Sequence, residues 1–213
     1  MDRSMYSLIL LDEVVREVDR LAHREGLSRS GLINRILAEH IGLSTPEKQL
    51  DRLYGAARKK MEETPSLRVQ NAENTPGSSL LSIKSALPYR YNPTIRYNVE
   101  LTLRDGSYVG ELRVVSRSQS GELLKLLRLF FRAWKQLEQS LSHSPPTAIA
   151  GGKMTRELRI RGEDTDRTGE ALAAYIQMFD TALDTFFAAP EAQNWNKQIE
   201  LYNEYLNSAD ILI

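Results

Sequence analysis

Residues 5–11 alternate between the two sides of a strand. One side carries Tyr6, Leu8 and Leu10. The other side carries Met5, Ser7 and Ile9. The pattern therefore predicts a short strand at the start of the chain, with an apolar side that needs to be buried.

Two amphipathic helices are expected after this strand. Asp12 is predicted to cap the first, which should end at Gly26, because glycine most easily takes the left-handed closing conformation. Ser28 is predicted to cap the second, which should end at Gly42. Apolar residues recur at helical spacing in both: Val14, Val18, Leu21, Ala22, Leu32, Ile33, Ile36, Leu37 and Ile41.

One strand and two short helices cannot bury this much apolar surface alone. A lone strand also leaves the hydrogen-bonding groups of its backbone edge unpaired. Pairing with the same strand of a second chain would solve both problems. The sequence therefore predicts a homodimer.

The order of strand, helix, Gly-Leu-Ser turn and helix resembles the ribbon-helix-helix family of DNA-binding proteins, of the CopG, Arc and MetJ type. The resemblance covers residues 4–42. It rests on Leu10-Leu11-Asp12-Glu13-Val14, Leu21-Ala22 and Gly26-Leu27-Ser28-Arg29-Ser30. It implies a ribbon of two antiparallel strands, one from each chain, that enters the major groove of double-stranded DNA.

The resemblance also implies two sets of DNA contacts. Base edges would be read by the outward residues of the ribbon and the residue before them, which are Arg3, Met5, Ser7 and Ile9. Phosphate would be bound at the start of the second helix, by Ser28, Arg29 and Ser30. A helix N-terminus suits this second task because its free N–H groups and partial positive charge attract anions.

The outward side of the strand departs from the family pattern, which is usually polar. Only Ser7 can hydrogen-bond a base edge, whereas Met5 and Ile9 can only touch a thymine methyl group or another apolar surface. Two interpretations stay open. The ribbon reads an A·T-rich site with help from Arg3, or it has lost sequence reading and only dimerises.

Residues 44–65 form a predicted connector helix. Ser44 and Glu47 have the spacing of a capping box, and the helix should run to Glu63. Its apolar positions are Leu50, Leu53, Tyr54, Ala57 and Met61. Packing on a neighbouring domain is the favoured role of this stripe, and a short two-chain coil is the alternative.

Residues 66–213 are predicted to form a larger α+β domain. After a loop over 66–80, residues 95–104 alternate clearly, Asp105-Gly106 forms a tight turn, and residues 108–115 return as a second strand. A helix over 123–141 is expected to cover this hairpin. Beyond a flexible connection at 144–152, we expect a strand at 155–161 and helices at 169–188 and 192–207.

The fold class is therefore α+β, with a module at 1–43, a connector at 44–65 and a domain at 66–213 that binds an effector or partner or forms oligomers. The net charge is zero, but residues 64–143 carry 11 Lys/Arg against 6 Asp/Glu, and residues 144–213 carry 6 against 11. These two regions could attract each other within a chain or across a dimer, or could be two solvated surfaces.

The sequence offers little catalytic chemistry. The chain has no cysteine, which excludes thiolate metal sites. Its three histidines, His23, His40 and His143, are too few to form the His and Cys clusters that bind nickel in the nickel-responsive members of the ribbon-helix-helix class. Asp164 and Asp166 lie in an acidic cluster before a helix, where capping is favoured over a hard-metal site. We expect no enzyme, no cofactor and no membrane span.

The sequence thus predicts a cytoplasmic, prokaryotic, sequence-specific transcriptional regulator that acts as a repressor. It would work as a dimer, with a tetramer left open. One alternative is an antitoxin-type DNA-binding protein whose C-terminal part binds a partner protein. The other is a ribbon-helix-helix dimer that is kept only for protein interaction.

Overall fold

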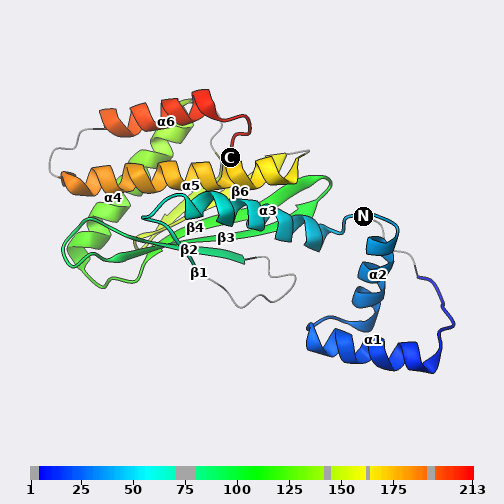
Figure 1. Ribbon diagram of the computed structural model, residues 1–213. Helices are drawn as coiled ribbons and strands as arrows, with labels where there is room; N and C mark the ends of the chain where they lie inside the picture. The colour runs from blue at the N-terminus through cyan, green and yellow to red at the C-terminus, as the bar shows by residue number, and fades with distance from the viewer. Residues whose placement is uncertain (1–4, 71–79, 142–144, 162–163, 191–194) are drawn as a thin grey trace.

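An antiparallel sheet organises most of the chain in a computed structural model that describes residues 5–70, 80–141, 145–161, 164–190 and 195–213 (Figure 1). Its six strands are β1 (Arg68–Gln70), β2 (Leu80–Ala86), β3 (Thr94–Arg104), β4 (Ser107–Ser116), β5 (Thr147–Ala150) and β6 (Lys153–Arg161). They lie in the order β1-β2-β3-β4-β6-β5, with every neighbouring pair antiparallel. The predicted α+β class is confirmed.

The β3–β4 hairpin has the predicted turn. Asp105 and Gly106 both have positive φ angles, of 48° and 73°, as a tight two-residue turn between twisted strands requires. Along β3 every second side chain is buried, beginning with Ile95, Tyr97 and Val99. The residues between them lie on the other side of the sheet, so only one face of the sheet is covered.

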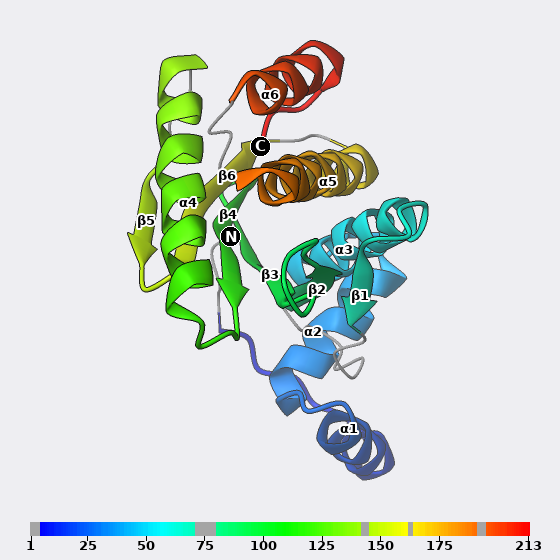
Figure 2. The same cartoon turned by 90° about the vertical axis from the view of Figure 1, so that its left-hand side faces the viewer.

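Helices α3 (Pro46–Glu62), α4 (Gly121–Leu141) and α5 (Thr165–Ala188) lie on that face, and α6 (Asn196–Ser208) packs on α4 and α5 (Figures 1 and 2). The aromatic core joins them. Phe179 of α5 packs against Phe130 and Trp134 of α4, and Trp134 packs against Tyr202 of α6. Among the described residues, no helix is long and apolar enough to cross a membrane.

The apolar stripe of α3 packs into this core, as predicted, so it is not available for a two-chain coil. Leu53, Ala57 and Met61 are fully buried. The Tyr54 hydroxyl accepts a hydrogen bond from the Leu101 backbone N–H at 3.0 Å, which joins α3 to β3. The predicted cap is wrong, because the helix begins one residue later and the Thr45 side chain accepts from the Lys48 N–H.

Three strands were not expected from the sequence. β1 lies within the predicted loop over 66–80, β2 follows it, and β5 lies in the predicted flexible connection at 144–152. The rest of the predicted loop, residues 71–79, lies outside the described residues. All three strands occupy or adjoin the sheet edges, where pairing with a neighbour rather than a strong local pattern decides their conformation.

A buried ion pair joins the sheet to two helices. Arg156 of β6 donates to Glu138 of α4 at 3.0 Å, and both side chains are almost wholly inaccessible to solvent. Tyr175 of α5 donates to the same carboxylate at 2.7 Å, and its ring lies under the Arg156 guanidinium. Removing one partner would leave the other charge buried and uncompensated.

Helices α3 and α5 approach each other closely at Gly169. A Cβ atom there would overlap the Leu53 carbonyl oxygen and lie 2.9 Å from the Ala56 Cβ, so this crossing requires glycine. We expect Gly169→Ala to lower the free energy of unfolding by about 2 kcal/mol through overpacking. Chemical denaturation of the wild-type protein and the variant would measure this change in the free energy of unfolding.

Gly55 provides the matched control, since it lies inside α3 and a Cβ there would meet nothing within 4 Å. Gly55→Ala is expected to raise stability by up to about 1 kcal/mol through helix propensity. Equal effects of the two substitutions would show that the close crossing does not constrain the fold.

Candidate nucleic-acid interface

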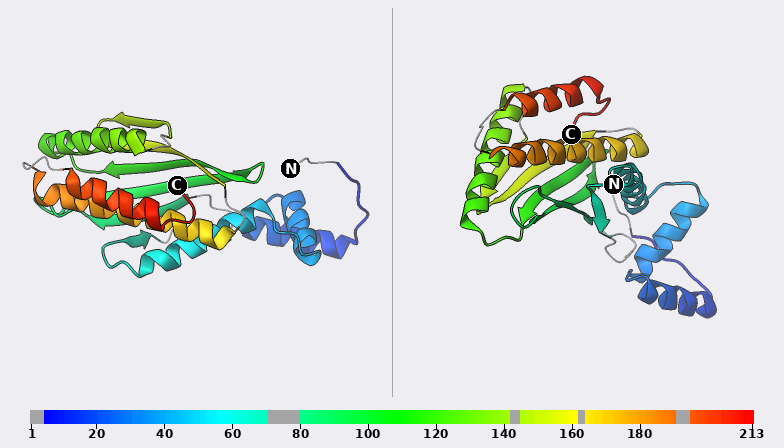
Figure 3. Two further views of the ribbon diagram at one scale, coloured as in Figure 1. Left: turned by 90° about the horizontal axis from the view of Figure 1, so that it is seen from above. Right: turned by 60° about the vertical axis from the view of Figure 1, so that its left-hand side comes forward.

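The two N-terminal helices, α1 (Asp12–Arg24) and α2 (Arg29–His40), lie apart from the sheet and its helices (Figures 1 and 3). The turn between them has the predicted chemistry. Gly26 has a φ of +66°, and the Ser28 hydroxyl accepts a hydrogen bond from the Gly31 N–H at 3.1 Å. Gly42, after α2, also has a positive φ. The local signals of the helical hairpin are therefore confirmed.

The strand predicted at residues 5–11 is absent from the single chain. Within the described part of the molecule, residues 5–10 form no backbone hydrogen bond with another segment. A strand is defined by its pairing, and this chain alone offers this segment no partner strand. The predicted cap is also wrong, because α1 includes Asp12 and Leu11 stands at the cap position without a side-chain hydrogen bond.

Residues 5–11 are all exposed and show only part of the expected difference between their two sides. On the side predicted to be buried, Leu8 and Leu10 are 60% and 40% exposed but Tyr6 is 82% exposed, and on the other side Met5 and Ile9 are 98% and 103% exposed. Leu8 and Leu10 are thus partly covered by the chain, while Met5 and Ile9 project into solvent. Ser7 is exposed on the same side as Met5 and Ile9, and Arg3 lies outside the described residues.

Exposed apolar side chains are concentrated in this part of the molecule. Eleven of the fifteen large apolar side chains that are exposed among the described residues lie between positions 5 and 43. They are Met5, Tyr6, Leu8, Ile9, Leu10, Leu11, Val14, Ile36, Leu37, Ile41 and Leu43. Apolar surface gathered in this way marks a surface for another macromolecule.

A groove of about 500 Å³ runs along α1 and continues this surface. Its lining combines the apolar Val14, Val18 and Leu21 with the charged Glu13, Glu17, Arg20 and Arg24. Apolar side chains with charged neighbours are the usual composition of a protein contact surface.

The three residues predicted to bind phosphate lie together at the start of α2. Ser28, Arg29 and Ser30 are all exposed, and the two serine hydroxyls are 3.3 Å apart. Arg29, however, makes a bidentate ion pair with Asp19 of α1, with both N···O distances at 2.5 Å. This bond raises the pKa of Arg29 and lowers the pKa of Asp19. Arg29 would have to share or leave Asp19 to bind a phosphate.

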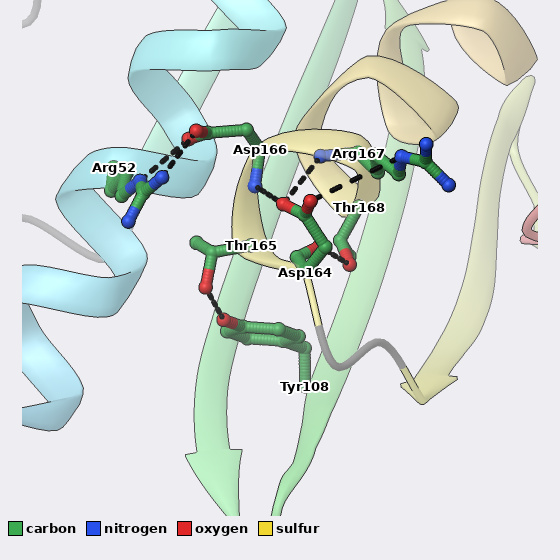
Figure 4. A network of polar contacts seen from close by, with 7 residues as sticks. All are labelled: Arg52, Tyr108, Asp164, Thr165, Asp166, Arg167 and Thr168. Atoms are coloured by element: carbon green, nitrogen blue, oxygen red, sulfur yellow. Dashed lines mark hydrogen bonds and ion pairs between the residues drawn. The ribbon is translucent and has the colours of Figure 1, made fainter.

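The acidic cluster before α5 acts as a cap, as the sequence favoured (Figure 4). The Asp164 carboxylate accepts from the N–H groups of Asp166 and Arg167, at 2.9 and 3.3 Å. Asp166 makes a bidentate ion pair with Arg52, which joins the start of α5 to α3. Among the described residues, no group of three or more His, Cys, Asp or Glu side chains could hold a metal ion.

A second titratable cluster was not expected from the sequence. Tyr97 of β3 donates to the buried Asp180 of α5 at 2.6 Å, and Ser85 of β2 donates to it at 3.1 Å. Burial raises the pKa of Asp180. Burial, together with the charge of Asp180, raises the pKa of Asp184 one turn later to about 7. The cluster combines residues of β2, β3 and α5, which are far apart in the sequence, so no local sequence motif predicts it.

The chain matches no known family model, no curated protein and no solved structure.

The pKa of Asp184 predicts a pH dependence of stability. Because its folded pKa lies above the unfolded value, the folded state binds more protons between about pH 4 and pH 7, and stability falls as pH rises through this window. We expect Asp184→Asn to raise the free energy of unfolding at pH 8 by about 1 kcal/mol, the full shift being reduced because part of the side chain faces solvent.

The measurement is urea denaturation of both proteins at pH 4 and pH 8. The difference should be much smaller at pH 4, where Asp184 is protonated in the folded state and about half protonated in the unfolded state. Asp210→Asn, at an exposed carboxylate near the end of the chain, is the control and should change neither curve. A wild-type stability that rises steadily from pH 4 to pH 8 would contradict the prediction.

Proposed function

We propose that this chain is a sequence-specific transcriptional regulator that acts as a cytoplasmic homodimer and represses its target. Residues 5–11 of two chains pair into an antiparallel ribbon that enters the major groove of double-stranded DNA. The resemblance of residues 4–42 to the ribbon-helix-helix family supports this proposal, as does the local geometry of α1, the Gly26 turn and α2.

The observation that carries the proposal is the number of apolar side chains that stay exposed in residues 5–43 of the single chain. This segment holds most of the exposed large apolar side chains and begins with seven residues whose backbone has no partner strand. Two copies satisfy both demands together, because pairing the strands supplies the backbone hydrogen bonds and covers their apolar side. Large apolar burial is the dominant favourable term in such association.

Two parts of the module would contact DNA, the start of α2 and the ribbon of residues 5–11. The start of α2 offers free N–H groups and exposed Ser28, Arg29 and Ser30 to a phosphate. These contacts would set the register of the protein on the duplex, and Ser7 would supply polar base reading. Asp19 competes with the DNA phosphate for Arg29, so the ion pair between Asp19 and Arg29 would lower the affinity for DNA.

A ribbon that only dimerises is the second candidate. The nearly complete exposure of the apolar Met5 and Ile9, and the ion pair that occupies Arg29, favour it. Retention of genomic DNA separates the two functions. The purified full chain is incubated with fragmented DNA of its own genome, and the retained fragments are sequenced at several salt concentrations. Failure to retain any fragment would select the dimerisation function.

Leu8 and Ile9 are a matched pair on opposite sides of the proposed ribbon. We expect Leu8→Glu to dissociate the dimer, because it places a charge on the side that the ribbon covers. Ile9→Glu should leave the dimer intact and reduce DNA affinity at least tenfold, since it turns a negative charge toward phosphate. Sedimentation and fluorescence anisotropy measure the two effects. Dissociation by both variants would refute this orientation of the ribbon.

Arg29 and Ser7 test the two kinds of DNA contact. Arg29→Ala should weaken binding to all sequences alike and reduce the dependence of log K on log salt by about 2, because the dimer loses one phosphate contact from each chain. Ser7→Ala should instead reduce the discrimination between target and non-target duplexes by about 1 kcal/mol. Asp19→Ala is the control, and it should strengthen binding by freeing Arg29. Uniform losses from all three would refute the assignment of Ser7 as a base reader.

A further inference from the structure

Four cations form one row across the open face of the sheet, the face that no helix covers. In the strand register, Arg68 of β1 lies opposite Lys84 of β2, and Lys84 lies opposite Arg96 of β3. The row continues through Val115 of β4 to Lys153 of β6. We call Arg68, Lys84, Arg96 and Lys153 the basic row. Five adjacent strands at about 4.8 Å spacing give it a length of about 19 Å.

The basic row is not neutralised by the protein. Within the part of the chain that the structure describes, none of its four side chains has an ion pair or a hydrogen bond. The Nε of Arg96 is buried and has no partner. Like charges placed directly opposite each other on neighbouring strands destabilise a sheet. The row therefore costs stability in the free protein, and a bound anion would remove that cost.

The nearest carboxylates of the same face are already engaged. Glu100 of β3 and Glu111 of β4 both pair with Arg113, which lies two residues along β4 from Val115 and so on the same face as the basic row. Glu157 lies opposite Glu111, so a row of three glutamates follows. These acidic side chains separate the basic row from a second group of cations, Arg104, Arg159 and Arg161, at the other end of the same face.

We propose that the basic row binds the phosphate backbone of double-stranded DNA, at a place separate from the N-terminal module. Its linear charge suits a polyanion, because a duplex presents one charge per about 1.7 Å of its axis and would set about 11 charges along 19 Å. Single strands are disfavoured, because no strand residue described on the open face is aromatic and none could stack a base.

The position of the basic row makes it a second DNA contact. The chain enters α3 from the module and leaves it six residues before Arg68, and the 17 residues of α3 span about 25 Å. The module and the basic row are therefore separated by about the length of this helix. One dimer would then carry three DNA contacts, the shared ribbon and one basic row from each chain, and these could hold separate molecules or parts of one bent molecule.

A sandwich capture assay tests the second contact with the full chain. A short duplex is fixed to beads, the protein is bound to it, and a second, fluorescent duplex is then offered. We expect the wild-type protein to capture the second duplex. The triple variant Lys84→Gln, Arg96→Gln and Lys153→Gln should stay on the first duplex and capture at least tenfold less of the second.

The same triple variant should show a shallower salt dependence of total duplex binding, with the slope of log K against log salt reduced by about 2 to 3. Its melting temperature should be unchanged or higher, since removing facing like charges relieves repulsion. A protein in which these side chains were only structural would instead melt at a lower temperature.

The matched control neutralises three cations at the other end of the same face: Arg104→Gln, Arg159→Gln and Arg161→Gln. It makes the same change in net charge and should leave second-duplex capture largely intact. If both triple variants lost second-duplex capture equally, the effect would depend only on net charge, and this result would overturn the proposal. So would a basic-row variant that changes the sedimenting mass while capturing both duplexes normally, because the surface would then bind protein.

The two DNA contacts fail in distinguishable ways. If Arg29→Ala and Ile9→Glu leave binding unchanged while the basic-row variant abolishes it, the module assignment is wrong and the basic row stands. If the module variants abolish binding and the basic-row variant retains full second-duplex capture, the basic row is wrong and the module stands.

Discussion

One-sided burial of the sheet is the constraint on which the rest of the structure depends. All the helices of the larger part lie on the same side of the sheet, so the core fills the space between the sheet and α3, α4 and α5 and continues between α4, α5 and α6. An antiparallel sheet can leave its other face in water, provided that face is polar. The open face meets this condition with rows of charges, and it is free to bind other molecules.

The same one-sided core determines how the N-terminal helices are attached. Helix α3 follows them directly, and its inner stripe is buried against α5 and the sheet while the Gly169 crossing brings it close to α5. The ion pair of Arg52 with Asp166 adds a surface contact at the same place. These contacts fix the position of α3, which the N-terminal helices precede directly in the chain.

Much of the fold could be predicted because its signals are local. Strand β3 has strict alternation, Asp105-Gly106 has the chemistry of its turn, and Ser28 has the chemistry of a helix cap. Strands β1, β2 and β5 could not be predicted, because they depend on neighbours in the sheet. The site residues Ser28, Arg29 and Ser30 were placed together by sequence, but the partner of Arg29 was not, since Asp19 meets it only when α1 folds back on α2.

The sequence by itself determined the alternation of the β3–β4 hairpin, the Gly26 turn and Ser28 cap of the helical hairpin, and the excess of apolar side chains in residues 5–43. These features depend on residues that are close together in the chain, so they can be predicted from the sequence. Only the tertiary structure decided which charges are neutralised. Arg156 is buried against Glu138, Arg113 is shared by two glutamates, and Lys84 faces Arg96 without a counterion. Charge pairing depends on register and on packing across the sheet, which distant segments establish together.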